Sequence, residues 1–201
     1  MCYYDLPSVK IRIFAYLCSV MGNNYSDQDF FERLTARLAA SCFRNGWMPE
    51  MMPSSPDIDG RWTCLLDGFA GDAVHEFNAW PEVTLAWAGY MGAAVAKLWD
   101  TDFGRCMAVS YDDMKGSKGF DDLDEHVTRD ILGLPLDSDE ARSLASRLAY
   151  CGAEALSAMR HEPVEDLTAE AYKVFLRSIE AMYRIGAALQ LSAMGYRFEK
   201  Q

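Results

Sequence analysis

The sequence predicts an all-α fold, built as a single-domain array of about seven helices. Apolar residues recur at helical spacing along most of the 201 residues, and glycine or proline stands near the ends of these segments. Only residues 9–13 alternate between apolar and basic side chains as a strand would, and no second convincing strand is present to pair with them. Helices packed on helices are therefore the expected architecture.

The segment from Pro81 to Trp99 is predicted to be the central, buried helix. Pro81 suits a first helical position, because the N–H that it lacks has no partner there. Wound as a helix, the segment separates its side chains by size. The small side holds Leu85, Ala88, Gly89, Gly92, Ala93 and Ala96, and the bulky side holds Val83, Trp87, Tyr90, Met91, Val95 and Leu98. Each glycine would destabilise an ordinary helix by roughly 1 kcal/mol, so we expect another backbone to approach the small side closely.

Two helices are predicted ahead of this segment. The first, Leu6–Gly22, has a proline in its first turn and a glycine at its end, although the alternation over residues 9–13 leaves a strand open. The second begins at Ser26, with Asp29 three residues later as in a capping box, and stops at Asn45-Gly46.

Residues 48–60 contain three prolines and two adjacent serines, which predicts an irregular connector. This connector is the only plausible boundary within the single domain of residues 1–201. It would separate an N-terminal helical subdomain, residues 1–47, from a main helical body, residues 61–201.

The regions on either side of the central helix are predicted to be less regular. Residues 61–79 keep helical spacing, but Gly68 and Gly71 indicate one kinked helix or two short ones. After the central helix we expect a weakly patterned helix at residues 102–114, a loop at 115–119 and a short helix at 121–132 that ends at Gly133.

Two long helices at the C-terminus are predicted to form an antiparallel hairpin. Asp137, with a glutamate three residues later, is expected to cap the first, which stops before Pro163. The second begins near Asp166 or Thr168 and ends at Gly195. The short linker places the two helices side by side.

The composition argues against several classes of partner. The chain has 19 basic and 30 acidic residues, a formal charge of −11, which makes the approach to nucleic acid or an anionic membrane costly. The longest uncharged apolar run, Val83–Ala96, is shorter than the roughly 20 residues of a spanning helix. We see no secretory signal and no paired cysteine spacing, so we expect a cytoplasmic protein whose six cysteines are free thiols.

Residues 111–130 are the strongest candidate for chemistry, with seven acidic residues, three basic residues and one of the three histidines. On a helix, Asp122 and Asp130 lie one turn before and after His126, so the three side chains could share a face. Such a trio could bind a divalent ion or pair a general base with an orienting acid. The simpler interpretation is a solvated acidic face whose first aspartates cap the helix and favour its dipole.

Two weaker candidates involve the other histidines and a loop. His75 could join His126 and His161 in a metal site between helices, but the paired spacings of such sites are absent. A surface or core position is simpler for His75, and a cation at a helix C-terminus is simpler for His161. The loop 116–119 places a lysine between glycines, yet it lacks the Walker pattern and four acids follow it closely.

The leading functional hypothesis is a non-catalytic cytoplasmic helical protein that binds another protein or a copy of itself, through a helix face and the acidic region 112–130. No cofactor is predicted. The competing hypothesis is a metal-dependent or small-molecule enzyme with Asp122, His126 and Asp130 at its site, helped by Asp113 or His75. A nucleic-acid mimic is a weaker third possibility, because the basic residues dilute the acidic surface.

Overall fold

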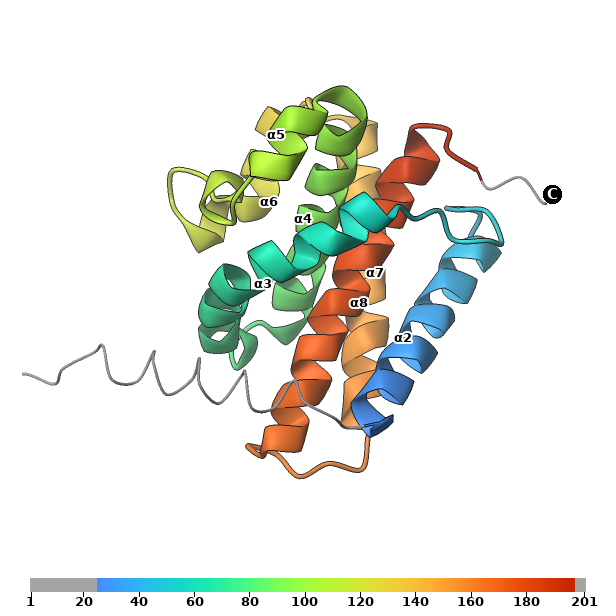
Figure 1. Cartoon of the computed structure of the whole chain (residues 1–201), viewed down its shortest axis with the longest axis vertical. Helices are drawn as coiled ribbons and strands as arrows, with labels where there is room; N and C mark the ends of the chain where they lie inside the picture. The colour runs from blue at the N-terminus through green and yellow to red at the C-terminus, as the bar shows by residue number, and fades with distance from the viewer. Residues whose placement is uncertain (1–24, 198–201) are drawn as a thin grey trace, which may run out of the picture.

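Helices form the regular elements of the part of the chain that the structure describes, residues 25–197. The structure is a computed structural model (Figure 1). Its seven α-helices in that range are α2 (Tyr25–Arg44), α3 (Pro56–Phe77), α4 (Pro81–Thr101), α5 (Phe103–Ala108), α6 (Leu123–His126), α7 (Asp139–Arg160) and α8 (Ala169–Ala193). The prediction of an all-α fold is confirmed. The helix or strand predicted at Leu6–Gly22 lies outside the described residues.

Helix α4 lies at the centre of the fold, as predicted for the segment near 81–99 (Figure 1). It packs against α3, α5, α7 and α8, and every residue from Ala88 to Ala96 is buried. That stretch has no solvent-facing stripe because other helices cover all of its sides. Within residues 25–197, neither α4 nor any other helix combines the length and the hydropathy that crossing a bilayer requires.

The small side of α4 meets α8 with the two backbones in contact. A Cβ atom placed on Gly92 would overlap the carbonyl group of Tyr183 on α8, and one placed on Gly186 would overlap the carbonyl group of Gly89 on α4. A Cβ atom on Gly152 of α7 would lie 2.8 Å from a carbonyl oxygen of α4. The predicted close approach is therefore present, and glycine is required because no side chain fits between these backbones.

Helices α7 and α8 form the predicted antiparallel hairpin (Figure 1). The N-cap of α7 is Ser138 and not the predicted Asp137, because Ser138 has the extended backbone of a cap and its hydroxyl accepts the Ala141 N–H at 3.1 Å. Thr168 caps α8, one of the two predicted starts. Gly195, in the left-handed region with φ +92°, follows the end of α8 as predicted.

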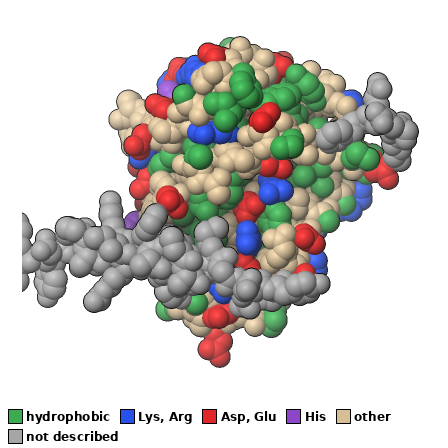
Figure 2. Space-filling model, viewed as in Figure 1, with side chains coloured by type: hydrophobic (Ala, Val, Ile, Leu, Met, Phe, Trp, Pro, Cys, Tyr) green, Lys and Arg blue, Asp and Glu red, His purple; other side chains and the backbone are tan. Residues whose placement is uncertain are grey.

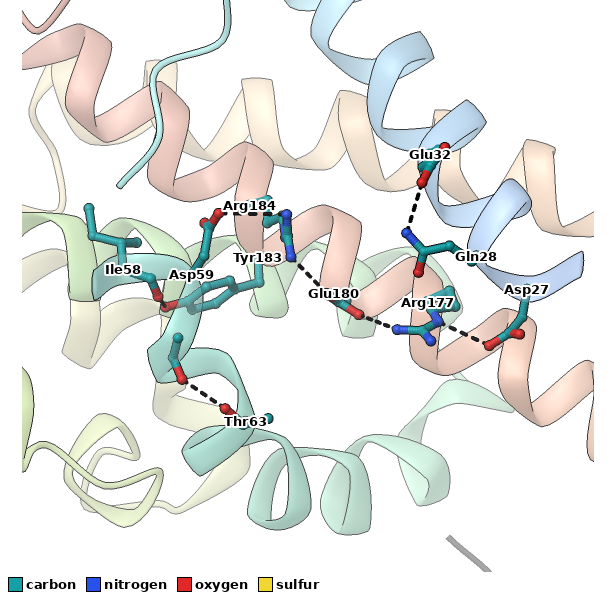
Figure 3. Close-up of polar contacts among 11 residues, drawn as sticks. Asp27, Gln28, Glu32, Ile58, Asp59, Thr63, Arg177, Glu180, Tyr183 and Arg184 are labelled. Atoms are coloured by element: carbon teal, nitrogen blue, oxygen red, sulfur yellow. Dashed lines mark hydrogen bonds and ion pairs between the residues drawn. The ribbon is translucent and has the colours of Figure 1, made fainter. Parts of the chain in front are cut away.

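Helix α3 begins five residues earlier than predicted. Pro56 takes its first position, where a missing N–H costs nothing, so residues 56–60 are helical and only residues 45–55 form the irregular connector. The helix continues through Gly68 and Gly71 to Phe77 without interruption. Figures 1 and 3 show it bending along its length, so the structure has the single bent helix of the two predicted alternatives.

Helix α2, the second predicted helix, packs along α7 and α8. Its buried apolar residues belong to the same core cluster as those of α4 and α8. Arg33 donates to Glu162 at 2.9 Å on the surface, and further along α2 the sulfur atoms of the buried Cys42 and Cys151 lie 3.5 Å apart. The four cysteines in the described residues are free thiols: Cys42, Cys64, Cys106 and Cys151. Only Cys64 among these is exposed, and Cys2 and Cys18 lie outside the described residues.

The segment between α4 and α7 is helical only in short pieces. Of the helix predicted at residues 102–114, the structure forms α5 and a 3₁₀ turn at Asp112–Met114. The helix predicted at 121–132 changes its hydrogen-bond pattern twice: a 3₁₀ turn at Phe120–Asp122 precedes α6, and a π-helical turn at Val127–Ile131 follows it. Gly133, with φ +73°, ends this run as predicted.

We expect Gly92→Ala to destabilise the protein by at least about 1 kcal/mol. The new methyl group meets backbone atoms of α8 that cannot rotate away, and overpacking of about 1 to 3 kcal/mol outweighs the better helix propensity of alanine. Gly71→Ala is the matched control, because nothing lies within 4 Å of its Cβ position and the same change should stabilise by up to about 1 kcal/mol. Urea unfolding of both variants measures the difference, and equal shifts of the same sign would contradict the close crossing.

Candidate functional site

His126 has a partner on each of its ring nitrogens. Its Nδ1 lies 2.8 Å from Oδ2 of Asp130, one turn later, and its Nε2 lies 3.3 Å from the carbonyl oxygen of Asp113. Hydrogen bonds from Arg129 and from His126 hold the pKa of the Asp130 carboxyl below its ordinary value. Two members of the predicted trio are therefore in contact, and the imidazole is engaged within the protein.

Asp122, the third member of the predicted trio, faces a different part of the chain. It is buried, and its Oδ2 lies 3.5 Å from the hydroxyl of Ser117. Its carboxylate also packs against Gly116, where an added Cβ atom would lie 2.5 Å from the carboxyl carbon. Because Asp122 belongs to a 3₁₀ turn, the α-helical register that would stack it beneath His126 is not kept. Between these two described residues no hydrogen bond forms.

The other two histidines lie apart from this segment in the secondary structure. His75 is exposed in the last turn of α3. His161 is the C-cap of α7, and its Nδ1 lies 2.6 Å from the carbonyl oxygen of Ser157, a favourable place for a cation. Across residues 25–197, no group of three or more histidine, cysteine, aspartate or glutamate side chains is arranged to hold a metal ion.

Several carboxylates of the acidic region 112–130 are already hydrogen-bonded or paired with a basic side chain. Asp113 accepts the backbone N–H and the hydroxyl of Ser110 at 2.9 and 2.7 Å, and these bonds lower the pKa of its carboxyl. Lys115 lies 2.8 Å from Asp112 and 3.5 Å from Asp72 of α3. The contact with Asp72 holds the segment against α3, and both ion pairs reduce the negative charge that the segment presents to a partner.

A row of alternating charges joins α2, α3 and α8. Figure 2 shows basic and acidic side chains interspersed along this face, and Figure 3 shows their contacts. Arg177 lies 3.1 Å from Asp27 of α2 and 2.9 Å from Glu180. Arg184 lies 3.1 Å from Glu180 and 3.6 Å from Asp59 of α3. Burial raises the pKa of the Asp59 carboxyl, and Arg184 opposes that shift. The charges compensate one another, which fits a role in aligning three helices.

An open groove lies where α7 turns into α8. Its volume is about 740 Å³, and it is bordered by the end of α3, the start of α4, the end of α7 and the first turns of α8. Its apolar walls include Val74, Phe77, Leu156, Met159, Tyr172 and Phe175. The rings of Phe77 and Phe175 meet edge to face with their centroids 4.8 Å apart, which joins α3 to α8 at the groove. Sites that bind ligands commonly have about this volume and this apolar character.

The surroundings of the groove are mainly apolar. Val74 on its wall is 39% exposed, and Trp80 and Val83, on either side of the lining residue Pro81, are 64% and 41% exposed. The polar residues of the lining are Asn78, Arg160, Glu162, Asp166 and Thr168. Exposed apolar residues gathered at a hollow are a mark of an interaction surface, whereas isolated ones are ordinary.

Leu167, on the lining of the groove, has an unusual conformation. Its φ is +62°, the left-handed region that leucine rarely adopts, and its side chain is fully exposed. It directly precedes the cap Thr168, a position from which an apolar residue often packs onto the helix that follows. Its full exposure excludes that packing. A strained backbone that presents an apolar side chain to solvent is typical of a binding site.

Sequence reasoning missed this groove because four separate segments build it. Ala171 and Phe175 stand one helical turn apart on α8, but no local pattern indicates that α3 would end opposite them and leave the space open. Two signals in the sequence were available. Trp80 and Val83 are apolar residues at a junction between helices, and Leu167 is an apolar residue in the otherwise polar turn between the last two helices.

We expect His126→Ala to cost under about 2 kcal/mol, because the imidazole joins two surface groups by single hydrogen bonds. Differential scanning fluorimetry with and without Mn²⁺ or Zn²⁺ provides the measurement. The shift of the midpoint by either ion should be the same in parent and variant. Strong stabilisation of the parent that disappears in the variant would restore the metal-site hypothesis for this histidine.

Leu167→Gly should leave the free energy of unfolding unchanged or raise it by up to about 1 kcal/mol. Glycine relieves the left-handed strain, and its larger entropy in the unfolded chain offsets part of that gain. Chemical denaturation of the two proteins gives the comparison. A loss of more than about 1 kcal/mol would mean that the leucine side chain contributes packing, contrary to its exposure.

Comparisons with models of known protein families, with curated proteins and with solved structures found no match to this chain.

Proposed function

We propose that this chain is a non-catalytic, cytoplasmic binding module whose groove holds the apolar face of an amphipathic helix from a protein partner. The observation that carries this proposal is the open groove of about 740 Å³ beside α8, with its apolar walls and the exposed Leu167 on its lining. It belongs to the recognition mode in which a helix lies in a hydrophobic groove between other helices.

The arrangement of the walls favours a helix as the occupant. Residues one helical turn apart, such as Ala171 and Phe175 on α8, line the groove, and α7 contributes Leu156 and Met159 opposite them. Ridges with that spacing accept side chains placed at i, i+3, i+4 and i+7 on a partner helix. The groove is open to solvent, which suits a partner helix better than a small enclosed ligand.

The charge of the whole chain favours a basic partner. On the lining of the groove Glu162 is already paired with Arg33, and Arg160 offsets Asp166, but the chain carries a formal charge of −11. Complementary charge accelerates encounter and selects among partners, even where it adds little affinity. We therefore expect lysine or arginine next to the apolar positions of the partner helix.

The groove supports a function better than the region 112–130 does. Asp113 and Asp130 in that region are already hydrogen-bonded, and Asp122 is buried against its own loop. The enzyme hypothesis needs Asp122, His126 and Asp130 to act together, whereas Asp122 accepts a hydrogen bond from the hydroxyl of Ser117. The groove, in contrast, is open and has apolar walls that a partner could contact.

A labelled model peptide tests the proposal. The probe is a 17-residue amphipathic helix with leucine at i, i+3, i+4 and i+7 and lysine elsewhere, and fluorescence anisotropy measures its binding to the full chain. Val74→Lys places a charge on the wall of the groove at a position exposed enough to keep the fold. We expect this change to weaken binding by at least about 10-fold, which corresponds to roughly 1.4 kcal/mol.

Phe103→Lys is the matched control, because Phe103 is 52% exposed on α5, at the opposite end of the molecule from the α7–α8 turn (Figure 1). It makes the same change of net charge away from the groove and should leave binding within about 2-fold. Equal weakening by both variants would show that the peptide responds to overall charge and not to the groove. A peptide with glutamate in place of lysine should bind at least about 10-fold more weakly.

A further inference from the structure

We propose that Cys42 of α2 and Cys151 of α7 are a redox-active pair, which a peroxide converts reversibly into a disulfide that joins the two helices. Neither residue lines the groove, so the pair is independent of the proposed function. Three observations carry the proposal: the contact between the two sulfur atoms, the separation of both from the other described cysteines, and the part-buried contact beside them.

The two sulfur atoms are in contact although 109 positions separate the residues in the sequence. They lie 3.5 Å apart, and both side chains are fully buried. The sulfur atoms of a disulfide lie about 2.05 Å apart, so these two have to approach by about 1.5 Å. A small rotation about each Cα–Cβ bond moves the sulfur atoms over such a distance, so the disulfide can form between α2 and α7 as they are packed.

The other described cysteines are engaged elsewhere. Cys64 is exposed on α3, and the sulfur of the buried Cys106 on α5 lies 3.7 Å from the carbonyl oxygen of Val95. Among the cysteines of residues 25–197, Cys42 and Cys151 are the two whose sulfur atoms contact each other. The fold therefore determines which disulfide oxidation would form, although the spacing of cysteines in the sequence gives no indication of it.

A partly exposed contact lies next to the buried thiols. Ser41 and Tyr150, the residues that precede the two cysteines, bring their hydroxyl oxygens within 3.1 Å of each other. Tyr150 is 40% exposed, so solvent reaches the residue beside Cys151. Local opening of this contact gives a small oxidant such as hydrogen peroxide access to the sulfur atoms, whereas a bulky one such as oxidised glutathione needs the helices to separate.

The surroundings make Cys42 the first of the two thiols to react. Its hydrogen bond with Cys151 and the nearby charge of Arg147 lower the pKa of Cys42, against the effect of burial. The same hydrogen bond and burial raise the pKa of Cys151. The thiolate is the nucleophile in such reactions, so Cys42 attacks the oxidant and Cys151 completes the disulfide.

The reaction takes place in two steps. The Cys42 thiolate attacks one oxygen of hydrogen peroxide: an S–O bond forms, the O–O bond breaks, and hydroxide leaves and takes up the proton that Cys42 released, which gives water and a sulfenic acid. The Cys151 sulfur then attacks the Cys42 sulfur: an S–S bond forms, the S–O bond breaks, and the departing hydroxide takes the Cys151 proton as water. Two thiols are oxidised to one disulfide while one peroxide is reduced to two waters. A dithiol reverses the change by thiol–disulfide exchange.

Peptide mapping of the full chain tests the pairing directly. The native protein is treated with hydrogen peroxide, free thiols are blocked with N-ethylmaleimide in denaturant, and trypsin is added without reductant. This digestion releases Cys42 in residues 38–44 and Cys151 in residues 148–160. We expect these two peptides to be joined in most of the oxidised protein, at a yield that does not depend on protein concentration, and to separate on treatment with dithiothreitol.

Three outcomes of this mapping would overturn the proposal. The first is that both thiols remain free while the exposed Cys64 is oxidised. The second is that Cys42 or Cys151 is joined mainly to a different cysteine. The third is a yield that falls on dilution, because the cross-link would then join two copies of the chain.

The stability of the oxidised protein is a second measurement. A disulfide between residues 42 and 151 restricts the unfolded chain over a long loop, so oxidation should raise the urea midpoint of the parent by at least about 1 M. Cys106→Ala removes a buried thiol outside the pair and should keep this rise, whereas Cys151→Ala should abolish it. An equal rise in both variants would contradict the proposal. The mapping of the parent protein needs no variant, so it stays decisive if Cys151→Ala does not fold.

Dimedone, which reacts with sulfenic acids, tests the order of the two steps. After brief oxidation, Cys42 in the Cys151→Ala variant should take up at least about 10-fold more dimedone than Cys151 does in the Cys42→Ala variant. The opposite preference would overturn the assignment of Cys42 as the first thiol to react.

Discussion

The fold depends on the crossing of α4 and α8, where the two backbones touch. Gly92 and Gly186 leave no side chain between the helices, and each would place a Cβ atom onto backbone atoms of the other helix. Such a contact fixes the separation of the helices more tightly than interdigitating side chains do, because a backbone cannot change its rotamer. Once α8 is held there, α2, α3 and α7 pack around it, and the position of the groove follows.

The groove is the place where this packing is incomplete. Helix α3 ends at Phe77 and α4 begins at Pro81, so the chain reverses beside the first turns of α8 and leaves part of them uncovered. Leu167 lies on the lining of the same groove, and its left-handed backbone leaves its apolar side chain fully exposed to solvent. Natural sequences remove such strain easily, by glycine or asparagine, where nothing depends on it. Its presence beside an open apolar wall is one of the observations from which we propose a binding role for the groove.

Local signals in the sequence predicted most helices, the close approach to the small side of α4 and the α7–α8 hairpin, whereas a site built from several distant segments could not be predicted. Pro81 and Gly195 mark helix ends in the structure because their effects on the backbone are local. The N-cap of α7 is Ser138 and not the predicted Asp137. Both residue types suit an N-cap, so the sequence alone does not distinguish between them. Asp122 does not stack beneath His126 because it belongs to a 3₁₀ turn, whereas the prediction assumed a continuous α-helix over both residues. The groove was missed because it depends on where α3 ends relative to α8, a contact that no local pattern specifies.

The distribution of charge limits what the groove could bind. The whole chain has 30 acidic and 19 basic residues, a formal charge of −11. The acidic composition that argues against nucleic acid therefore also favours the approach of a basic helix. The charged residues on the lining largely compensate one another, because Glu162 is paired with Arg33 and Arg160 stands near Asp166 in the sequence. The long-range charge would thus affect the rate of encounter, whereas the apolar walls would decide how long a helix remains bound.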